Sequence, residues 1–246
     1  QQAARGVMYD RNGVIMAGSR PAYSVIMPVE RKKNTLSDEE LDRLAALLKV
    51  KPEDIKKKID DNKLAFGAIY LANDVGIDVA TQIEEKKDDF PGIEIEVNPL
   101  RVYPLGAAGA QVLGYVGEAG PDDRDAEGNP YKTATLVGRS GLERQYNKFL
   151  EGKNGSKTVE VNASGQPVRY VEGTPAVSGN NVRLTLDANL QKAAEDAMES
   201  QVKTLAHSGV FPTGASAVAI DPNTGAVLAM ASWPSYDPNH FSKGIT

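Results

Sequence analysis

Cysteine does not occur in the 246 residues, and histidine occurs only twice. The lack of cysteine excludes disulfide bonds, thiolate catalysis and cysteine-ligated zinc. The two histidines, His207 and His240, lie in separate segments without a third partner, which indicates loop or turn residues rather than a metal site or a general base. No stretch of about 18 apolar residues is present, so the sequence predicts no membrane-spanning helix.

An excess of positive charge is also missing. The formal net charge is −5, whereas a nucleic-acid-binding surface needs a basic footprint. Hydrophobic residues make up 41% and charged residues 25% of the chain, as in an ordinary soluble globular protein. A chain of this length fits one or two domains.

What is present begins with a hairpin signal and a helix pair. Asn12-Gly13 adopts positive φ at little cost and predicts a hairpin within residues 5–29. Ser37 and Glu40 have the spacing of a capping box at the start of a helical region over residues 35–62. A DNA-reading helix-turn-helix is disfavoured there, because Glu53, Asp54, Asp60 and Asp61 flank the lysines 56–58 and this mixed charge predicts a solvated face.

Further along, helices are expected at about 78–87, 142–150 and 188–205, the second closed by Gly152 and the third capped by Asp187. A strand is expected at 182–186. The acidic loop 122–128 faintly resembles a calcium loop, but its twelfth position, counted from Asp123, is Ala134 rather than a bidentate glutamate. An exposed turn is predicted instead.

The C-terminal segment carries two apolar runs, Ser216–Ile220 and Ala226–Ser232, around the turn Asp221–Gly225. Such a pattern predicts a β-hairpin. Residues 214–241 as a whole closely resemble the opening hairpin of the transpeptidase domain in class B penicillin-binding proteins.

Earlier clusters resemble the three motifs of that family's N-terminal pedestal module, in the family's order. The first runs from Arg5 to Gly13, the second from Arg101 to Gly106 with Gly114–Gly117, and the third from Gly138 to Gly155. The stretch Leu184–Gln191 is similar to the family's join between its two domains. The Arg-x-Tyr-Pro cluster and the Pro-Ser-Tyr-Asp-Pro-Asn run favour the elongation-type branch over the division-type one.

The resemblance implies an α+β fold. We expect an elongated, multi-segment pedestal (dimerisation) domain of short sheets over residues 1–178, with a helical head at about 35–90. Residues 179–246 are expected to be the first part of an α/β-type, serine β-lactamase-like transpeptidase domain, ending before the catalytic serine.

In function, the resemblance implies a peptidoglycan transpeptidase that crosslinks stem peptides during cell-wall elongation and is acylated by β-lactams. It implies a single membrane anchor upstream of Gln1 and an extracytoplasmic location. The implied partners are a SEDS-class membrane glycosyltransferase and elongation scaffold proteins, with no cofactor, metal or nucleic acid. A stand-alone, non-catalytic scaffold module is the alternative.

Catalysis by this chain itself is not expected. The family's motif set runs Ser-x-x-Lys, Ser-x-Asn, then Lys-Thr-Gly. Ser200–Lys203 and Ser178–Asn180 fit the first two, but in reversed order, and no Lys-Thr-Gly follows. A third hypothesis, a serine hydrolase that uses Ser200, is therefore disfavoured.

The motif residues are expected to have a structural, interdomain role. Arg5, Arg101 and Arg139 can pair in bidentate fashion with Asp10 or Glu143. Such pairs would fix the angle between pedestal and transpeptidase domain; the alternative is surface ion pairs worth about 0–1 kcal/mol each. The residues assigned to this role are Arg5, Gly6, Asp10, Arg11, Gly13, Arg101, Tyr103, Pro104, Gly106, Gly138, Gly141 and Glu143.

Overall fold

The computed structural model describes residues 2–28, 36–61, 68–125, 128–131, 135–156 and 173–242, and the backbone of 158–161 and 167–171. The chain divides into two compact units. The first comprises residues 21–100 and 156–174, and the second comprises residues 2–20, 101–155 and 175–246. Strands β2 (Ile15–Pro28) and β4 (Glu94–Val102) pair with each other and contribute residues to both units.

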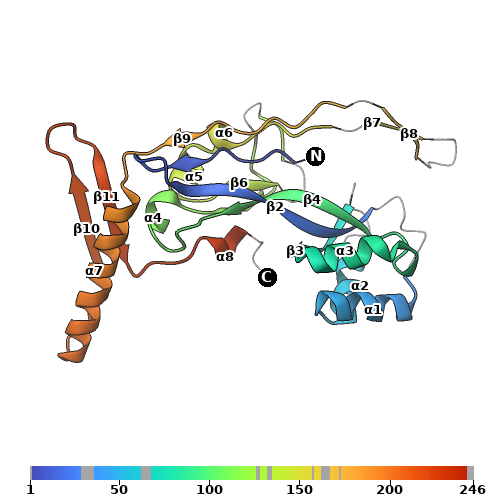
Figure 1. Ribbon diagram of the computed structural model, residues 1–246, viewed down its shortest axis with the longest axis horizontal. Coiled ribbons are helices and arrows are strands. Elements are labelled where there is room, and N and C mark those ends of the chain that lie inside the picture. Colours follow the sequence, from blue (N-terminus) through green and yellow to red (C-terminus); the bar gives the residue numbers. More distant parts are fainter. Residues whose placement is uncertain are drawn as a thin grey trace. The chain divides into compact units, whose positions relative to one another are not determined.

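In the first unit, the later half of β2 pairs antiparallel with β3 (Ala68–Val75), with Met27 opposite Ile69. Helices α1 (Asp38–Leu48), α2 (Pro52–Asp61) and α3 (Ile77–Glu85) pack against these strands, and a 3-10 turn, η2 (Lys87–Asp89), follows α3 (Figure 1). The three helices expected in this region are therefore confirmed.

The start of α1 follows the predicted chemistry. The Ser37 hydroxyl accepts the N–H of Glu40 at 3.3 Å, and the Glu40 carboxylate accepts the N–H of Ser37 at 2.7 Å. This capping box satisfies two backbone donors that a helix start leaves unpaired. Leu36 and Leu41, on either side of it, are both buried in one hydrophobic core.

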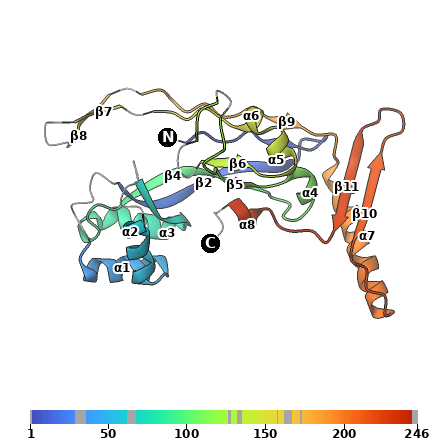
Figure 2. The same cartoon turned by 180° about the vertical axis from the view of Figure 1, so that it is seen from behind.

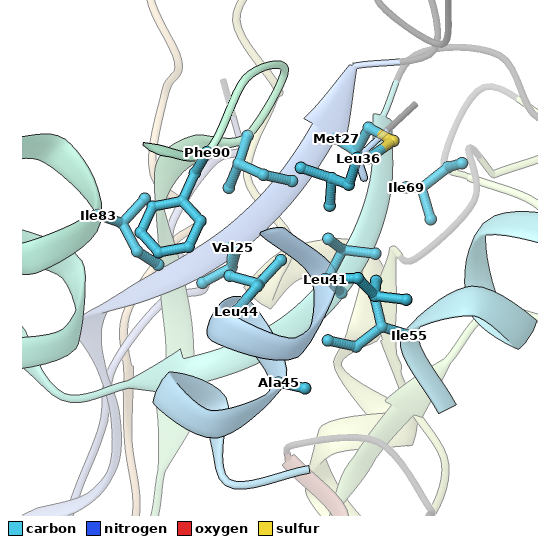
Figure 3. Close-up of a cluster of buried hydrophobic side chains, with 12 residues drawn as sticks. Val25, Met27, Leu36, Leu41, Leu44, Ala45, Ile55, Ile69, Ile83 and Phe90 are labelled. Carbon is cyan, nitrogen blue, oxygen red and sulfur yellow. The ribbon is translucent and has the colours of Figure 1, made fainter. Parts of the chain in front are cut away.

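That core fills the first unit. Leu44 is fully buried from α1, Ile55 from α2 and Ile83 from α3, over Val25 of β2 (Figure 3). The apolar spacing of the helices therefore has its expected consequence, a shared core beneath one face of the strands.

Strands β7 (Thr158–Val161) and β8 (Pro167–Val171) form an antiparallel ribbon, which Figure 1 shows in gold.

In the second unit, the short strand β1 (Met8–Tyr9) pairs antiparallel with β2 and parallel with β9 (Val182–Arg183). The predicted N-terminal hairpin is confirmed. The strand predicted over 182–186 ends at Arg183 because β1, its partner, is two residues long. Beyond it, the Thr185 hydroxyl donates to the carbonyl of Val227.

Short elements complete this unit: α4 (Ala110–Leu113), β5 (Val116–Glu118), β6 (Leu136–Gly138), α5 (Gly141–Gln145) and α6 (Asn147–Leu150). The single helix predicted over 142–150 is wrong, because Tyr146 interrupts it. Gly152 is also not a left-handed cap: α6 ends at Glu151 in extended conformation. A Cβ on Gly152 would lie 2.3 Å from the carbonyl oxygen of Val177, so this glycine permits close backbone approach.

The last part of the second unit is α7 (Ala188–His207), the hairpin of β10 (Ala215–Ile220) and β11 (Val227–Trp233), and α8 (Asn239–Ser242). Asp187 caps α7 as predicted, accepting N–H groups of Asn189 and Leu190. Helix α7 lies along the hairpin, and α8 lies near β5, as the view from behind also shows (Figure 2). The predicted C-terminal hairpin is confirmed.

Among the residues that the structure describes, no helix is both long and apolar enough to cross a membrane.

Candidate functional site

A buried carboxylate, that of Glu143 on α5, is the centre of a polar cluster in the second unit. The side chain has no exposed surface and lies between two guanidinium groups. Arg5 donates to Oε2 through Nη2 at 2.8 Å and Nε at 3.2 Å. Arg101 donates to Oε1 through Nε at 2.6 Å, and its Nη2 makes an ion-pair contact at 2.6 Å. Each carboxylate oxygen therefore faces one arginine fork.

Two more guanidinium nitrogens and the Tyr103 hydroxyl also find acceptors, whereas Arg101 Nη2 has only its ion-pair contact with Glu143 and makes no hydrogen bond. Arg101 Nη1 donates to the carbonyl of Gly6 at 2.7 Å, and Arg5 Nη1 donates to Asn147 Oδ1 at 3.0 Å. The Tyr103 hydroxyl donates to Glu143 Oε1 at 3.2 Å. Burial, and then the charge of Glu143, raise the pKa of Tyr103 far above its ordinary value, so this hydroxyl stays protonated and remains a donor.

The cluster ties together chain segments that are distant in sequence. Arg5 and Glu143 are 138 positions apart, and Arg101 and Glu143 are 42 apart. A buried ion pair adds little net stability over an apolar substitute, but removing one partner leaves an uncompensated charge and costs about 3–5 kcal/mol. The arrangement therefore specifies how the segments meet, rather than adding general stability.

A second polar centre is Asp10, which is fully buried at the turn between β1 and β2. Its Oδ1 accepts the N–H groups of Asn12 at 2.7 Å and Val14 at 2.8 Å, and its Oδ2 accepts that of Ala188 at 3.1 Å. Burial alone would raise the pKa of Asp10. The hydrogen bonds from Ala188, Val14 and Asn12 outweigh burial and hold the pKa below its ordinary value.

Asp10 thereby joins the first turn of the chain to the first residue of α7. Around it, Asn12 Nδ2 donates to Asp187 Oδ2 at 3.0 Å, and the Arg11 N–H donates to the carbonyl of Leu186 at 2.8 Å. The negative charge also lies at the N-terminus of α7, where the helix dipole favours an anion.

Gly138 lets the backbone close around Glu143. A Cβ at Gly138 would lie 2.0 Å from the carbonyl oxygen of Glu143, a distance that no side chain tolerates. Gly141 begins α5 with φ +54°, and a Cβ there would lie 2.5 Å from the carbonyl oxygen of Val112. Both glycines are therefore required by the approach of β6 and α4 to α5.

The structure brings together only part of the predicted set. Arg5, Gly6, Arg101, Tyr103, Gly138, Gly141 and Glu143 belong to the cluster or its walls, and Asp10, Arg11 and Gly13 form the β1–β2 turn. Pro104 is exposed, and Gly106 follows it with φ +59°.

Two of the predicted pairings are wrong. Asp10 binds backbone N–H groups instead of an arginine. Arg139 pairs with Asp123 at 2.8 Å, because successive side chains alternate and Gly138 holds the position facing Glu143. Asp123, from the acidic loop, also accepts the N–H of Gly120, which accords with a turn; Ala134 lies outside the described residues.

The set of site residues predicted from the sequence lacked Asn147 and Gln191, although Gln191 ends the stretch that resembles the family's join. Asn147 Oδ1 accepts the N–H of Gly138 at 2.9 Å as well as Arg5 Nη1; its position four residues after Glu143 was the available signal. Gln191, fully buried, pairs with both the N–H and the carbonyl of Met230 at 2.8 and 3.0 Å and attaches α7 to β11.

The other candidate chemistry is not assembled. Ser200 is exposed on α7, and Lys203 Nζ lies 2.6 Å from Glu199 rather than at the serine. His207 Nδ1 is 2.7 Å from the carbonyl of Lys203, in the last turn of the helix. The described ranges contain no group of three or more His, Asp or Glu side chains that could hold a metal ion.

The second unit thus contains a buried Arg-Glu-Arg cluster that joins chain segments distant in sequence. The chain belongs to the penicillin-binding protein dimerisation domain family, which matches residues 1–184. Its relatives place it among the class B penicillin-binding proteins, as the motifs predicted.

Among these relatives, the peptidoglycan D,D-transpeptidase MrdA of Escherichia coli K12 is 32% identical over 250 residues, which cover 99% of this chain and 37% of that protein. The peptidoglycan D,D-transpeptidase FtsI of the same organism is 30% identical over 244 residues, covering 97% of this chain and 37% of the relative. The chain thus spans little more than a third of the length of these relatives.

A solved structure is also similar. It is a complex between a penicillin-binding protein (PBP2) and MreC from Helicobacter pylori, matched with a TM-score of 0.74 and 27% identity. The match covers 100% of this chain and 44% of the solved chain. The mixed helix and sheet fold described above is therefore that of the corresponding part of PBP2.

Proposed function

We propose that this chain is the pedestal, together with the start of the transpeptidase domain, of a peptidoglycan D,D-transpeptidase. The observation that carries the proposal is the 32% identity to MrdA across 99% of the chain, which extends past residue 184, where the family match ends. The identity therefore includes α7 and the β10–β11 hairpin as well as the pedestal.

In this proposal, residues 1–178 form an elongated pedestal with a helical head at about 35–90, and residues 179–246 begin the catalytic domain. The Arg5–Glu143–Arg101 cluster holds the pedestal segments, and the β1–β2 turn joins them to the catalytic domain. The joint consists of Asp10 with Ala188, β1 with β9, and the Val7 N–H with Asn181 Oδ1 at 2.8 Å. The pedestal thereby positions the catalytic domain.

The reaction itself belongs to residues beyond Thr246. The whole protein would acylate a serine with the D-alanyl-D-alanine stem peptide, transfer the acyl group to a neighbouring stem, and react with β-lactams at the same serine. No group described above has the geometry of a nucleophile and base, so the chain by itself is expected to be inert.

The proposal extends to location and partners. An upstream helix would anchor the protein in the cell membrane with this chain on the extracytoplasmic side. Its pedestal would dock a SEDS-class glycosyltransferase and an MreC-type scaffold protein; the PBP2–MreC complex supports the second partner. The elongation branch is supported by the slightly higher identity to MrdA than to FtsI, 32% against 30%.

The test is to read the coding region on both sides of the chain and to label the encoded protein with a fluorescent penicillin. We expect an apolar span upstream, Ser-x-x-Lys within some tens of codons downstream, and covalent labelling. A stop codon directly after Thr246 and an unlabelled protein would contradict the proposal and favour a scaffold module.

Binding of MreC is tested separately, with the MreC-type protein of the same genome and this chain in a calorimeter. We expect saturable binding that survives loss of the catalytic domain. Binding seen only with the longer protein would remove the pedestal as the docking site.

A further inference from the structure

The segment Trp233–Ser242, here called the strap, follows β11 and lies against residues Tyr103–Tyr115, here called the receiving segment. Both belong to the second unit. The strap contacts the receiving segment mainly through side chains that bond to backbone atoms, so the interaction depends on register along the chain.

Asn239 makes the most specific of these contacts. Its Oδ1 accepts the N–H of Tyr103 at 2.9 Å, and its Nδ2 donates to the carbonyl of Tyr103 at 2.9 Å. One side-chain amide thus satisfies both backbone groups of one residue, as a neighbouring strand would. Asp237 Oδ1 accepts the Asn239 N–H at 2.9 Å and Nδ2 at 2.7 Å, which orients the amide.

Other hydrogen bonds also join the strap to the receiving segment. Ser235 Oγ donates to the carbonyl of Ala107 at 3.0 Å, and the Tyr236 hydroxyl donates to that of Ala110 at 3.1 Å. In the opposite direction, Gln111 Nε2 donates to the carbonyl of Pro234 at 3.0 Å.

Three aromatic rings, of Tyr236 and Phe241 in the strap and Tyr115 at the end of the receiving segment, also pack together. Phe241 stacks on Tyr115 with ring centroids 4.2 Å apart, and Tyr236 meets both rings edge-on at 5.8 and 6.0 Å. Edge-to-face and offset-stacked pairs favour defined orientations. The strap is therefore fixed at both ends.

Tyr103 connects the strap to the buried cluster. Its backbone is held by Asn239, and its hydroxyl donates to Glu143. The strap and the Arg-Glu-Arg cluster therefore both bind Tyr103, the strap at its backbone and the cluster at its hydroxyl.

We propose that Asn239 is a positioning residue for transpeptidation, acting through Tyr103. The docked strap fixes the path of the catalytic domain relative to the pedestal, so that the active site reaches peptidoglycan strands. This inference rests on the proposed function. A small, freely diffusing β-lactam needs only an intact active site, whereas crosslinking also needs the domain in place.

The docking is tested first, by amide hydrogen exchange on the present chain. Asn239→Ala is expected to raise the exchange rate of the Tyr103 amide by about tenfold or more, because its acceptor is removed. His240→Ala, an exposed neighbour, is the matched control and leaves that rate unchanged. An unaltered rate in Asn239→Ala overturns the inference.

Positioning is tested in cells whose only copy of the full-length protein carries Asn239→Ala. We expect fluorescent-penicillin labelling within about twofold of wild type and a reduced fraction of crosslinked muropeptides. Asn239→Asp retains an acceptor for the Tyr103 N–H. Its fraction of crosslinked muropeptides is expected to lie between that of wild type and that of Asn239→Ala. If Asn239→Ala does not accumulate, Ser235→Ala removes one strap hydroxyl, with its contacts to Ala107 and Gln111, and is expected to lower crosslinking less.

Normal crosslinking with an exposed Tyr103 amide contradicts the inference, and so does a parallel loss of labelling and crosslinking, which indicates a merely structural role. A wild-type protein that takes no label contradicts the proposed function, and the inference falls with it. A labelled wild type with normal crosslinking in Asn239→Ala contradicts the inference alone.

Discussion

Glu143 is fully buried and compensates the guanidinium groups of Arg5 and Arg101, and it also accepts the hydrogen bond of the Tyr103 hydroxyl. Glu143→Gln keeps the shape but leaves Arg5 and Arg101 as buried, like-charged neighbours. We expect the free energy of unfolding of the second unit to fall by about 3–5 kcal/mol, measured by urea denaturation.

Glu118→Gln is the matched control, because Glu118 is exposed at the end of β5. It is expected to change the free energy of unfolding by less than about 0.5 kcal/mol. If both variants unfold alike, the cluster does not hold the pedestal segments together.

Gly138 is the second residue-scale determinant. Gly138→Ala places a methyl group 2.0 Å from the Glu143 carbonyl oxygen, so the backbone of β6 or α5 must move. We expect a loss of about 3 kcal/mol or more, at the upper end of overpacking effects. Thermal unfolding of each variant measures this loss. Gly120→Ala is the control, because its Cβ would lie 3.6 Å from its nearest neighbour, Asp123, and it is expected to leave the melting temperature nearly unchanged. Equal melting temperatures for the two variants would show that β6 adapts freely.

At this scale the sequence predicted residue types better than partners. Forked guanidinium groups suit a carboxylate, so Arg5, Arg101 and Arg139 were predicted to pair with Asp10 or Glu143, and two of the three arginines bind Glu143. The pairing of Arg139 with Asp123 depends on which way one side chain alternates after β6, and that direction follows from a close approach visible only in three dimensions.

Among the elements, the junction of the β1–β2 turn with α7 is sensitive to pH. The folded-state pKa of Asp10 is depressed, so its stabilising contribution is fully present above the ordinary value of 3.8 and is lost as the pH falls through the folded-state pKa. Protonation removes acceptor strength toward Ala188 and Val14.

Asp10→Asn is therefore expected to be less stable than wild type at pH 7, and the difference is expected to shrink as the pH drops below about 4. Urea denaturation of both proteins from pH 7 to pH 2.5 measures it. A difference that stays constant over that range would assign the effect of the substitution to shape instead of charge.

The capping box of α1 makes a local contribution in the first unit. Ser37→Ala removes the acceptor for the Glu40 N–H and should destabilise the unit by about 1 kcal/mol, seen as faster exchange of the first-turn amides of α1. Ser37→Asp retains a capping oxygen and should restore slow exchange. Fast exchange in both variants would show that a capping side chain at position 37 does not control the stability of the first turn of α1.

Elements with a complete local signal were predictable: capped helices α1 and α7, and hairpins with turn-forming residues. The helix over 142–150 was not, because its apolar spacing gives no sign that Asn147 must turn toward Gly138 and Arg5. The helical segment is divided there at Tyr146.

On the scale of the whole molecule, the motifs identified the family, whereas the division into compact units could not be read from them. Each unit combines segments from distant parts of the chain, since β2 and β4 contribute residues to both. Two separate stretches, 21–100 and 156–174, build the first unit. The order of the motifs along the sequence does not indicate that separate stretches build one unit.

We propose that this chain supports a catalytic serine located elsewhere in the same protein. The most direct test is to treat the full-length protein with penicillin, digest it and map the covalent adduct by mass spectrometry. We predict one adduct, on the serine of a Ser-x-x-Lys motif beyond Thr246, and unmodified peptides throughout this chain. An adduct on Ser200, or a protein that takes no adduct at all, would contradict the account.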